Sequence, residues 1–478
     1  MNRKFKAVIG LEVHVELNTE SKMFCSCSSA FGAPVNSNIC PVCFGLPGAL
    51  PKLNKRAVEL AIKAGLALNC SINRIFNLDR KNYYYPDNPK NYQITQKDYP
   101  LCYGGSIEIE DSDGNYKTIN IERIHIEEDA GKLLHLKDKS LIDFNRAGTP
   151  LMEIVTMPDI TSPKEAVDFL KKLKRLLTAL GVSDCKMEEG SLRCDGNISL
   201  YDKTYNTAYN KVELKNINSF KALEKAFEYE IKRQSDLINC GKSINKETRR
   251  WDEQAMITQV MRKKEKGEDY RYLVEGDASS YKISEEFIDE IKRSLPELPE
   301  ERYKRFIRDY GLLPYEADLL CEDPCVSDFF EEAERTCSDP KAVSNWILGE
   351  LFRMLKEKNL KLRNIPLSGD MLGKLILLIK EGSISSSGGK AVFERMFLEG
   401  KDPKVIVTEE GLLQNSDGKY IESIVDEVFI ENPKALKEYK SGKENIATYL
   451  IGMSMKKSKG KANPVLVKEK VLEKLKRL

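Results

Sequence analysis

The sequence predicts an α+β protein in which a mainly antiparallel sheet is followed by a helical C-terminal half. Residues 1–160 alternate short strand patterns with turns of Gly, Pro and Asn, and strand patterns resume at 183–217. These strands alternate apolar and polar residues, which favours antiparallel pairing over a parallel sheet buried on both faces. After residue 300, apolar residues recur at helical spacing between breaks of Gly, Pro or Ser.

Two helices are predicted inside the strand-rich region. Ser162 and Glu165 form a possible capping box, Pro163 suits a first helical turn, and Gly181 suits the end of that helix. The second helix is predicted over 219–240 and ends before a glycine.

The C-terminal half is predicted to be all-helical. Its helical patterns lie at 300–311, 341–358, 370–381, 389–399, 421–430, 433–440, 443–456 and 464–477. The change of character near residue 292, with a weaker break near residue 405, predicts three domains. Their bounds are 1–292, 293–405 and 406–478.

The composition is that of a folded protein with several domains. The chain has 478 residues, of which 41% are hydrophobic and 31% charged. No apolar run approaches the ~20 residues that cross a bilayer, and the first apolar run contains Glu and His, unlike a secretory signal. Twelve cysteines in so long a chain do not suggest a disulfide scaffold. We therefore expect a cytoplasmic protein without a membrane anchor.

The charge is distributed unevenly along the chain. The formal net charge is only +2, but residues 434–478 contain 13 Lys and Arg against 4 Glu. A basic C-terminal tip on a near-neutral body suggests an anionic partner there.

Polar and apolar side chains alternate along five predicted strands. In "GLEVHVEL" (10–17), Leu11 and Val13 point one way and Glu12, His14 and Glu16 the other. Four other stretches repeat the pattern, with these polar members: Arg123, His125, Glu127 and Asp129; Asp143 and Asn145; Arg193, Asp195, Asn197 and Ser199; and Lys211, Glu213 and Lys215.

Alternation usually marks the solvated outer face of a sheet. Asp and Asn are poor strand formers, however, so their presence favours a concave surface equipped for chemistry. Carboxylates with one or two histidines suit a divalent cation such as Mg²⁺. The candidate ligands are Glu12, His14, Glu127 or Glu128, and Glu153. No GxxxxGK[ST] loop is present, so any nucleotide site is not of the P-loop kind.

Four cysteines have the spacing of a metal site. Cys25, Cys27, Cys40 and Cys43 read C-x-C-x₁₂-C-x₂-C, and two close thiol pairs can surround Zn²⁺ tetrahedrally. The alternatives are four unrelated buried thiols or a redox role for the Cys40–Cys43 pair. Structural zinc is the favoured interpretation. The other cysteines are scattered and are predicted to pack in the core.

Long strings of the sequence resemble one protein family. They include "GLEVHVEL", "CPVCFGLPGALP", "DRKNYYYPDNPKNYQI", "IHIEEDAGKLLH", "DFNRAGTPLMEIV", "MEEGSLRCDGNIS" and "KVELKNINSF". These strings closely resemble the GatB family, the B subunits of aspartyl/glutamyl-tRNA(Asn/Gln) amidotransferases. "SNWILGEL" and "KGKANP" are similar to that family's helical part and its YqeY-like tail. The resemblance extends in order over essentially the whole chain.

The resemblance implies a fold and a reaction. The N-terminal sheet would form a catalytic cradle, followed by a helical domain and a YqeY-like tRNA-binding tail. ATP would phosphorylate the side-chain carboxylate of Glu-tRNA(Gln), Asp-tRNA(Asn) or both, with Mg²⁺, and ammonia would displace the phosphate. A separate amidase (glutaminase), the A subunit, would release that ammonia from glutamine, and a small C subunit would complete a heterotrimer. The enzyme would be a carbon–nitrogen ligase with glutamine as the nitrogen donor.

The resemblance also implies roles for individual residues. The catalytic site would contain Glu12, His14, Glu127, Glu128 and Glu153, with Glu12, His14, Glu127 and Glu153 on Mg²⁺. The nucleotide or the tRNA end would be bound by Asn145, Arg146, Arg193, Asp195 and Asn197. The ammonia route would involve Lys81, Tyr83, Tyr84 and Lys90, although this Tyr-rich stretch could also be an ordinary packed loop. The tRNA phosphates would meet Lys456, Lys457, Lys459 and Lys461, whose alternative interpretation is a solvated basic helix.

Two other functions are compatible with parts of the sequence, and one segment diverges from the family. A non-catalytic tRNA-binding adaptor would not need the acids and histidines of the polar face. A free-standing zinc hydrolase would need an open zinc position, which four cysteine ligands would not leave. Residues 257–280 depart from the family's usual pattern, so no role is transferred to them.

Overall fold

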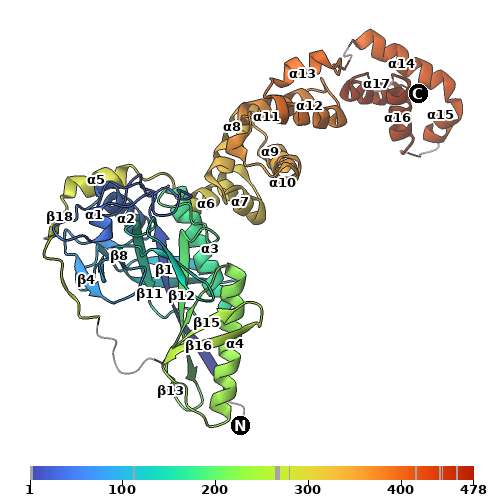
Figure 1. Ribbon diagram of the computed structural model, residues 1–478. Coiled ribbons are helices and arrows are strands. Elements are labelled where there is room, and N and C mark those ends of the chain that lie inside the picture. The colour runs from blue at the N-terminus through green and yellow to red at the C-terminus, as the bar shows by residue number, and fades with distance from the viewer. Residues whose placement is uncertain are drawn as a thin grey trace. The chain divides into compact units, whose positions relative to one another are not determined.

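The computed structural model describes residues 4–110, 114–263, 270–278, 280–414, 417–440, 443, 445–458 and 461–477. It divides into two units, Met1–Leu298 and Pro299–Leu478. Unit 1 contains all the described strands, and the described elements of unit 2 are all helices (Figure 1). The predicted α+β class, with a sheet first and helices after it, is confirmed.

One sheet organises unit 1. Within the described residues it has eleven strands, nine of them in the order β16-β15-β14-β12-β1-β11-β8-β6-β2, with β13 beside β12 and β7 beside β8. The strands are β1 (Phe5–Glu16), β2 (Ser71–Ile72), β6 (Cys102–Tyr103), β7 (Ser106–Glu110), β8 (Tyr116–Glu128), β11 (Pro150–Thr156), β12 (Leu192–Asp202), β13 (Thr207–Ala208), β14 (Val212–Lys215), β15 (Glu247–Asp252) and β16 (Ile257–Lys263). All these pairs are antiparallel except β14–β15.

Three smaller sheets lie beside the main one. They pair β3 (Ile75–Phe76) with β18 (Tyr281–Lys282), β9 (Lys132–His135) with β10 (Ser140–Asp143), and β4 (Asp79–Asn82) with both β5 (Tyr92–Thr95) and β17 (Leu273–Val274). One sequence expectation is corrected here. The alternation predicts Asp143 on a strand of the polar sheet, but Asp143 ends β10 in the separate β9–β10 hairpin. The short turn between those two strands keeps their pairing local.

Helices cover the apolar face of the main sheet. Unit 1 contains α1 (Pro41–Phe44), α2 (Lys55–Ala67), α3 (Pro163–Ala179), α4 (Phe220–Asn239) and α5 (Glu285–Arg293). Helices α2, α3 and α4 each pack against strands of the sheet. Leu11, Val13 and Val15 of β1 are buried on this face, whereas Glu12 and His14 point to the other. Alternation along β1 therefore separates a packed face from a polar one.

The two predicted helices of unit 1 begin and end where the sequence signals lie. Ser162 accepts a hydrogen bond from the Glu165 amide (3.2 Å), and Ser219 caps α4 in the same way. The Glu165 carboxylate accepts from the Thr161 amide (2.8 Å) and binds Lys117, so only half of the predicted capping box forms. Gly181 follows α3 with φ +68°, a conformation that glycine adopts readily.

Unit 2 contains the predicted helices and several more. Its elements are α6 (Pro299–Tyr310), α7 (Pro314–Leu320), α8 (Pro324–Cys337), α9 (Pro340–Trp346), a π-helical turn (Ile347–Leu351), α10 (Phe352–Lys358), a 3₁₀ turn (Leu362–Asn364), α11 (Gly369–Lys380), α12 (Ser386–Glu399), α13 (Pro403–Glu409), α14 (Gly418–Glu431), α15 (Pro433–Lys440), α16 (Asn445–Lys457) and α17 (Pro464–Lys476). The predicted helix 341–358 is thus interrupted by the π-helical turn.

The apolar core of unit 2 forms two clusters. One cluster extends from Phe306 to Val407 and the other from Ile421 to Leu475. The three-domain division of the chain, with a boundary near residue 405, stays a prediction beside this two-unit arrangement. None of the described helices is long and apolar enough to cross a bilayer.

Candidate active site

Polar side chains of neighbouring strands form a row across the sheet face opposite the helices. His14 of β1 is directly opposite Arg193 of β12 and Glu153 of β11, and Glu153 is opposite His125 of β8. Side chains directly opposite each other on one sheet face lie about 5 Å apart. The strand register therefore brings the sequence-predicted Arg193, His14, Glu153 and His125 into contact range.

His14, Glu127 and Glu153 meet at the centre of this face. His14 Nε2 lies 3.4 Å from Glu153 Oε2 and 3.8 Å from Glu127 Oε1. His125 Nε2 lies 3.2 Å from Glu153 Oε2 and 3.7 Å from Glu127 Oε2, and Thr95 donates a hydrogen bond to Glu127 (3.0 Å). One ligand atom each from His14, Glu127 and Glu153 lies within 4.8 Å of the other two.

The imidazoles and carboxylates of this cluster stabilise each other's charged forms. Burial alone would lower the pKa of His125, but Glu153 and Glu127 raise it to about 9, and they also hold the pKa of His14 above its ordinary value. Burial would raise the pKa of both carboxyl groups, yet the imidazoles hold the pKa of Glu127 below, and that of Glu153 well below, the ordinary range. Two carboxylates are therefore ionised at neutral pH in a poorly solvated place.

This donor set fits a divalent cation. Two carboxylates and one imidazole converge on one point, as metal ligands do, and oxygen-rich sets suit Mg²⁺. His125 stands behind the carboxylates as a hydrogen-bonding support.

A second acidic cluster lies beside the first and already has cationic partners. Glu12, Asp195 and Glu213 come within the same short range of one another. Lys215 binds both Asp195 (2.5 Å) and Glu213 (3.2 Å), and Asn197 donates to Glu12 (2.8 Å). Glu12 thus belongs to this second cluster rather than to the group of His14.

Arginines and two further acids border the first cluster. Arg193 donates to Asp129 (2.6 Å), and Arg146 Nε lies 3.5 Å from the same carboxylate. Burial and the charge of Asp129 raise the pKa of Glu16 to about 7. The sequence places Glu16, Asp129, Glu213 and Lys215 on the polar face but assigns them no role. The alternation that locates the predicted residues could have located these four in the site as well.

Lys81 lies on strand β4. Burial would lower the pKa of Lys81, but the negative charges of Glu127 and Glu153 raise it, so the two carboxylates stabilise the ammonium form. Lys81 Nζ also lies 4.9 Å from the centre of the Tyr270 ring. Burial raises the pKa of the Tyr83 hydroxyl. The Tyr84 side chain, in contrast, is exposed to solvent. The sequence gives no role to Tyr270, because it lies in the divergent segment.

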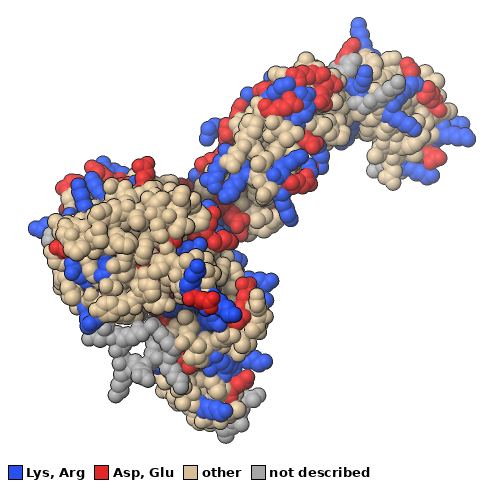
Figure 2. Space-filling model, viewed as in Figure 1, with Lys and Arg blue, Asp and Glu red and all other residues tan. Residues whose placement is uncertain are grey.

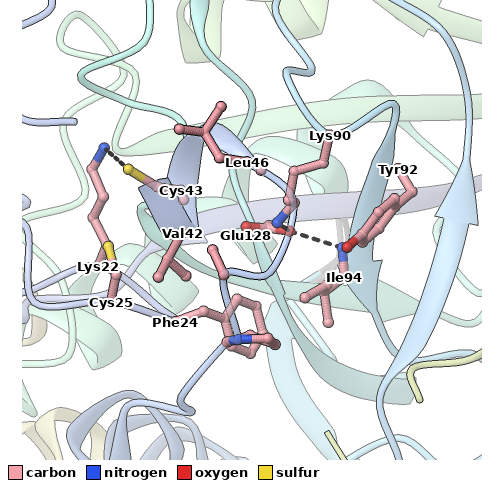
Figure 3. A pocket seen from close by; sticks show the side chains of 14 residues that line it. Lys22, Phe24, Cys25, Val42, Cys43, Leu46, Lys90, Tyr92, Ile94 and Glu128 are labelled. Atoms are coloured by element: carbon pink, nitrogen blue, oxygen red, sulfur yellow. Dashed lines mark hydrogen bonds and ion pairs between the residues drawn. The ribbon is translucent and has the colours of Figure 1, made fainter. Parts of the chain in front are cut away.

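Glu128 faces away from its neighbour Glu127. Adjacent residues of a strand point to opposite faces, so Glu128 enters a separate pocket, where Lys90 pairs with it and the Ile94 amide donates to it (3.0 Å) (Figure 3). The structure therefore brings the predicted Lys90 and Glu128 together, but apart from the group of His14.

The Asn145 side chain is hydrogen-bonded within the protein. Its side chain accepts from the Asn38 amide (2.8 Å) and donates to the Pro34 carbonyl (2.6 Å). These bonds hold the loop before Cys40 and use both the oxygen and the nitrogen of the Asn145 amide.

The four cysteines form a compact group. One sulfur from each of Cys25, Cys27, Cys40 and Cys43 lies within 4.8 Å of the others. Four thiolates about 2.3 Å from one zinc ion would lie about 3.8 Å apart, so the arrangement fits tetrahedral Zn²⁺. The buried Lys22 ammonium lies 3.6 Å from Cys43 Sγ, and the pKa of Cys43 falls to about 4 through its contacts with Cys25, Cys40 and Lys22.

The predicted tRNA-contacting lysines lie at the end of α16 and after it. Lys456 and Lys461 are exposed. Lys457 pairs with Glu427 (2.8 Å) and Glu431 (2.5 Å) of α14. Lys459 lies outside the described residues.

Comparison with protein families identifies two matching domains. Residues 7–289 match the GatB/GatE catalytic domain, and residues 328–475 match the GatB domain. The first match contains every residue of the polar face described above, and the second contains Lys456, Lys457, Lys459 and Lys461.

Individual relatives match over almost their whole length. The chain is 53% identical over 472 residues to the B subunit of the aspartyl/glutamyl-tRNA(Asn/Gln) amidotransferase from Clostridium kluyveri, covering 99% of both chains. It is 51% identical over 474 residues to the protein of the same name from Clostridium tetani, again covering 99% of both.

Proposed function

Because the chain belongs to the GatB family, the B subunits of aspartyl/glutamyl-tRNA(Asn/Gln) amidotransferases, we propose that it activates a tRNA-bound carboxylate with ATP. A free carboxylate does not accept ammonia directly, since its oxygen is a poor leaving group. Phosphorylation of the side chain of Glu-tRNA(Gln), Asp-tRNA(Asn) or both makes phosphate the leaving group. The observation that carries this proposal is the convergence of His14, Glu127 and Glu153 on the polar face.

His14, Glu127 and Glu153 would hold Mg²⁺, with Glu12 beside them. Bound Mg²⁺ supplies charge neutralisation for phosphoryl transfer. Phosphoryl transfer depends mainly on positioning and on cationic groups near the transferring oxygens. Lys81 would provide such a cation, because the charges of the same two carboxylates raise the pKa of its ammonium.

The nucleotide and the tRNA end would lie along the neighbouring strand β12. Arg193, Asp195 and Asn197 all face this side of the sheet, and Arg146 reaches it through Asp129. A guanidinium can pair with a phosphate, and an amide or a carboxylate can form hydrogen bonds with sugar and base groups. The proposal for Asn145 lacks such support, because its amide is already bonded within the protein.

The ammonia would reach the polar face past Lys90 and Glu128. Their pocket and a second one share Cys43, Lys90, Glu128 and Gly148, and the second also contains Tyr83 and Asp129. Asp129 is the partner of Arg193 on the polar face. Lys81 and Tyr84 complete the proposed route.

The assembly would be a cytoplasmic heterotrimer of this chain with an amidase, the A subunit, and a small C subunit. The relatives' name makes them the B subunit of an amidotransferase, and so members of a multi-subunit complex. The four cysteines would hold a structural zinc ion, and the basic tail would bind the misacylated tRNA. The reaction as a whole would be that of a carbon–nitrogen ligase using glutamine.

The test is an amidation assay with co-expressed subunits, glutamine, Mg²⁺, γ-labelled ATP and Glu-tRNA. Glu12→Gln and Glu127→Gln are compared with Glu122→Gln, a control on the same strand as Glu127 whose side chain is 51% exposed. The proposal expects Gln-tRNA and ATP cleavage from the native and control proteins. It expects a loss of at least ~100-fold in Glu127→Gln, while the partner's glutaminase activity survives.

Two results would contradict the proposal. A native rate of Gln-tRNA formation in Glu127→Gln would show that the polar face is not the activation site. A native complex that binds tRNA but never cleaves ATP would instead establish the adaptor function.

A further inference from the structure

Lys81 has an aromatic partner in the segment that diverges from the family's pattern. Its Nζ lies 4.9 Å from the centre of the Tyr270 ring. A cation within about 6 Å of a ring centre is attracted by the electron-rich face of the ring. Figure 2 shows many Lys and Arg side chains on the outer surface of the molecule, where water surrounds them. Lys81 is half-buried, so water weakens its contact with Tyr270 less than it would weaken a surface contact.

The strand register places Lys81 on the face of β4 and β5 that meets the carboxylates. Lys81 is directly opposite Gln93 of β5, and Thr95 lies two residues further along β5, so the three side chains share one face. From this face Thr95 donates to Glu127 (3.0 Å), and Gln93 donates to the Glu128 carbonyl (2.7 Å). The effect of Glu127 on the pKa of Lys81 agrees with this placement.

Tyr270 is held in place by its neighbours. The Asn82 amide donates to the Tyr270 carbonyl (2.9 Å), and the Asn82 side chain donates to the Arg271 carbonyl (2.7 Å). Arg271 has φ +45°, a left-handed conformation that is uncommon for residues other than glycine. The Tyr270 and Tyr272 rings meet edge to face with 6.0 Å between their centres. Backbone strain persists only where surrounding contacts impose it, so the fold fixes the position of the Tyr270 ring.

The other end of this segment is anchored to the strand that contains Lys81. Leu273 pairs with Arg80 of β4, and Val274 pairs with Asp79. Arg80 forms two hydrogen bonds to the buried carboxylate of Glu275 (2.7 and 2.5 Å). Because the segment is bonded to β4 at both ends, Lys81 and Tyr270 keep their relative positions.

We propose that Tyr270 is a positioning residue that holds the Lys81 ammonium towards the carboxylates of the activation site, an inference that rests on the proposed function. A lysine side chain loses much conformational entropy when it is ordered. The Tyr270 ring orders the ammonium before ATP binds, so the reaction step does not bear that cost.

The ammonium would then act during phosphoryl transfer. A side-chain carboxylate oxygen of the aminoacyl group bonds to the γ-phosphorus, and the bond from that phosphorus to ADP breaks. Lys81 neutralises the negative charge on the transferring oxygens. Since this charge belongs to the transition state, a misplaced Lys81 lowers kcat rather than substrate binding.

Positioning and plain packing depend on different properties of the side chain at position 270. Packing depends on its size and shape, whereas attraction to a cation depends on the electron density of the ring. Successive fluorination of a phenylalanine ring withdraws that electron density and changes the shape of the ring little. A fluorination series therefore separates the two roles.

The experiment introduces Tyr270→Phe, Tyr270→difluorophenylalanine and Tyr270→trifluorophenylalanine into the chain co-expressed with both partner subunits. The formation of ADP and of Gln-tRNA is measured with glutamine, Mg²⁺, ATP and Glu-tRNA, and kcat is separated from the KM values of ATP and Glu-tRNA. The matched control is the same series at Tyr281, whose ring stacks on Phe76 with 5.3 Å between the centres. The melting temperature of every variant is recorded.

The proposal expects a graded loss at position 270. Tyr270→Phe keeps kcat within about twofold of the native value, because the ring remains. The trifluoro variant loses ~3- to 30-fold in kcat for ADP and Gln-tRNA alike, and the difluoro variant is intermediate. Both KM values and the melting temperatures stay at the native level, and the Tyr281 series leaves kcat unchanged.

Three results would overturn the positioning role while the native complex is active. They are equal kcat values across the Tyr270 series, a loss of kcat that follows a falling melting temperature, and a loss confined to Gln-tRNA with ADP formation intact. The last result would assign Lys81 to ammonia delivery instead. Failure of the underlying function looks different, because the native complex itself would then form no ADP, and the positioning role would fail with it.

Discussion

At the scale of single residues, Lys22 places a buried positive charge beside the cysteine group. Its ammonium is fully buried, lies 3.6 Å from Cys43 Sγ and donates to the Asn38 carbonyl (2.7 Å). A buried ammonium is costly unless it is paired. A thiolate at Cys43, bound to zinc, would provide the pair, so the cysteine group and Lys22 stabilise each other.

Substitution of Cys40 by serine is expected to remove the zinc. Native protein should contain about one zinc ion per chain by elemental analysis, and Cys40→Ser less than about 0.2, because a structural site needs all four ligands. The exposed Cys240→Ser is the control and should keep its zinc. Native protein that lacks zinc, yet has full thermal stability without it, would refute a structural metal.

Alternation along the strands identifies most of the residues on the polar face, because period two fixes which face a side chain takes. It predicts that His14, His125 and Arg193 lie on the polar faces of their strands, whereas the strand register brings them together with Glu153. It does not separate Glu12 from that group, since the separation depends on strand register and on Lys215. The family resemblance assigns Glu128 to the site as well, although neighbours on a strand point apart.

At the scale of elements, the close approach of α4 to the sheet depends on a glycine in β12. A Cβ built on Gly196 would lie 2.5 Å from the Phe227 ring of α4. Leu11 of β1 is the neighbour of Gly196 across the sheet and is buried under the same helices. A larger residue at position 196 would therefore force the Phe227 ring or the strand beneath it to shift.

Gly196→Ala is expected to destabilise unit 1 by about 1–3 kcal/mol through overpacking. Gly10→Ala, in the adjacent strand, is the matched control, because the nearest atom to its new Cβ lies 3.8 Å away. Denaturant unfolding is followed by Trp251 fluorescence in a Trp346→Phe background, so that the signal reports unit 1. Equal unfolding midpoints for the two variants would refute the packing argument.

A buried ion network joins α4 to β15 and β16. Glu230 is fully buried, binds Arg233 (2.8 Å), and accepts from Thr258 (2.5 Å), while Arg249 lies 3.2 Å away. Burial would raise the pKa of Glu230, but these partners hold it below its ordinary value.

The network predicts an acid-sensitive contribution to stability. Because the folded-state pKa is depressed, the contribution is present above the unfolded pKa of about 4.3 and is lost as the pH falls through the folded value. Glu230→Gln should be about 1–3 kcal/mol less stable than native protein at pH 7, and the difference should shrink towards pH 3. The exposed Glu228→Gln on the same helix is the control, and a pH-independent difference would count against the network.

Helix-capping signals in the sequence predict some helices, whereas other helices lack such a signal. Ser162, Ser219 and the glycines after α3 and α4 mark both helices of the strand-rich region. Helix α2 is not predicted, because its apolar residues occupy much of its circumference and it lies among strand patterns. The short helices α7 and α13 have too few turns for a periodic signal. The parallel pairing of β14 with β15 also has no local signal, since α4 separates the two strands in sequence.

At the scale of the whole molecule, the charge asymmetry of the sequence predicts an anionic partner for the tail, which we propose to be tRNA. Lys456 and Lys461 are exposed, whereas Lys457 already pairs with two glutamates. The two exposed lysines should therefore release more counterions from tRNA than Lys457 does.

The double variant Lys456→Ala/Lys461→Ala should weaken tRNA binding and reduce the slope of log affinity against log salt by about 1–2. Lys6→Ala/Lys203→Ala, a pair of exposed lysines in unit 1, is the matched control. Filter binding over a range of salt concentrations measures both. An unchanged slope in the tail variant would indicate a solvated basic helix rather than a tRNA contact.

The order of the two halves could be predicted from the sequence, because hydrophobic periodicity changes from two to 3.6 near residue 292. The three-domain division stays a prediction, because it depends on whether the two core clusters of residues 299–478 fold independently. The family resemblance rests on long strings of sequence rather than on any single motif, and the convergence of His14, Glu127 and Glu153 depends on strand pairing that the sequence does not give.

The central claim is that a tRNA-bound carboxylate is activated by phosphorylation, and isotope transfer tests it most directly. Glu-tRNA carrying ¹⁸O in its side-chain carboxylate is amidated by the complete complex with ATP and Mg²⁺, and the released phosphate is analysed by mass spectrometry. The account predicts one ¹⁸O in phosphate for each amide formed, because the bridging oxygen leaves with the phosphoryl group. Phosphate free of ¹⁸O, alongside normal amide formation, would contradict it.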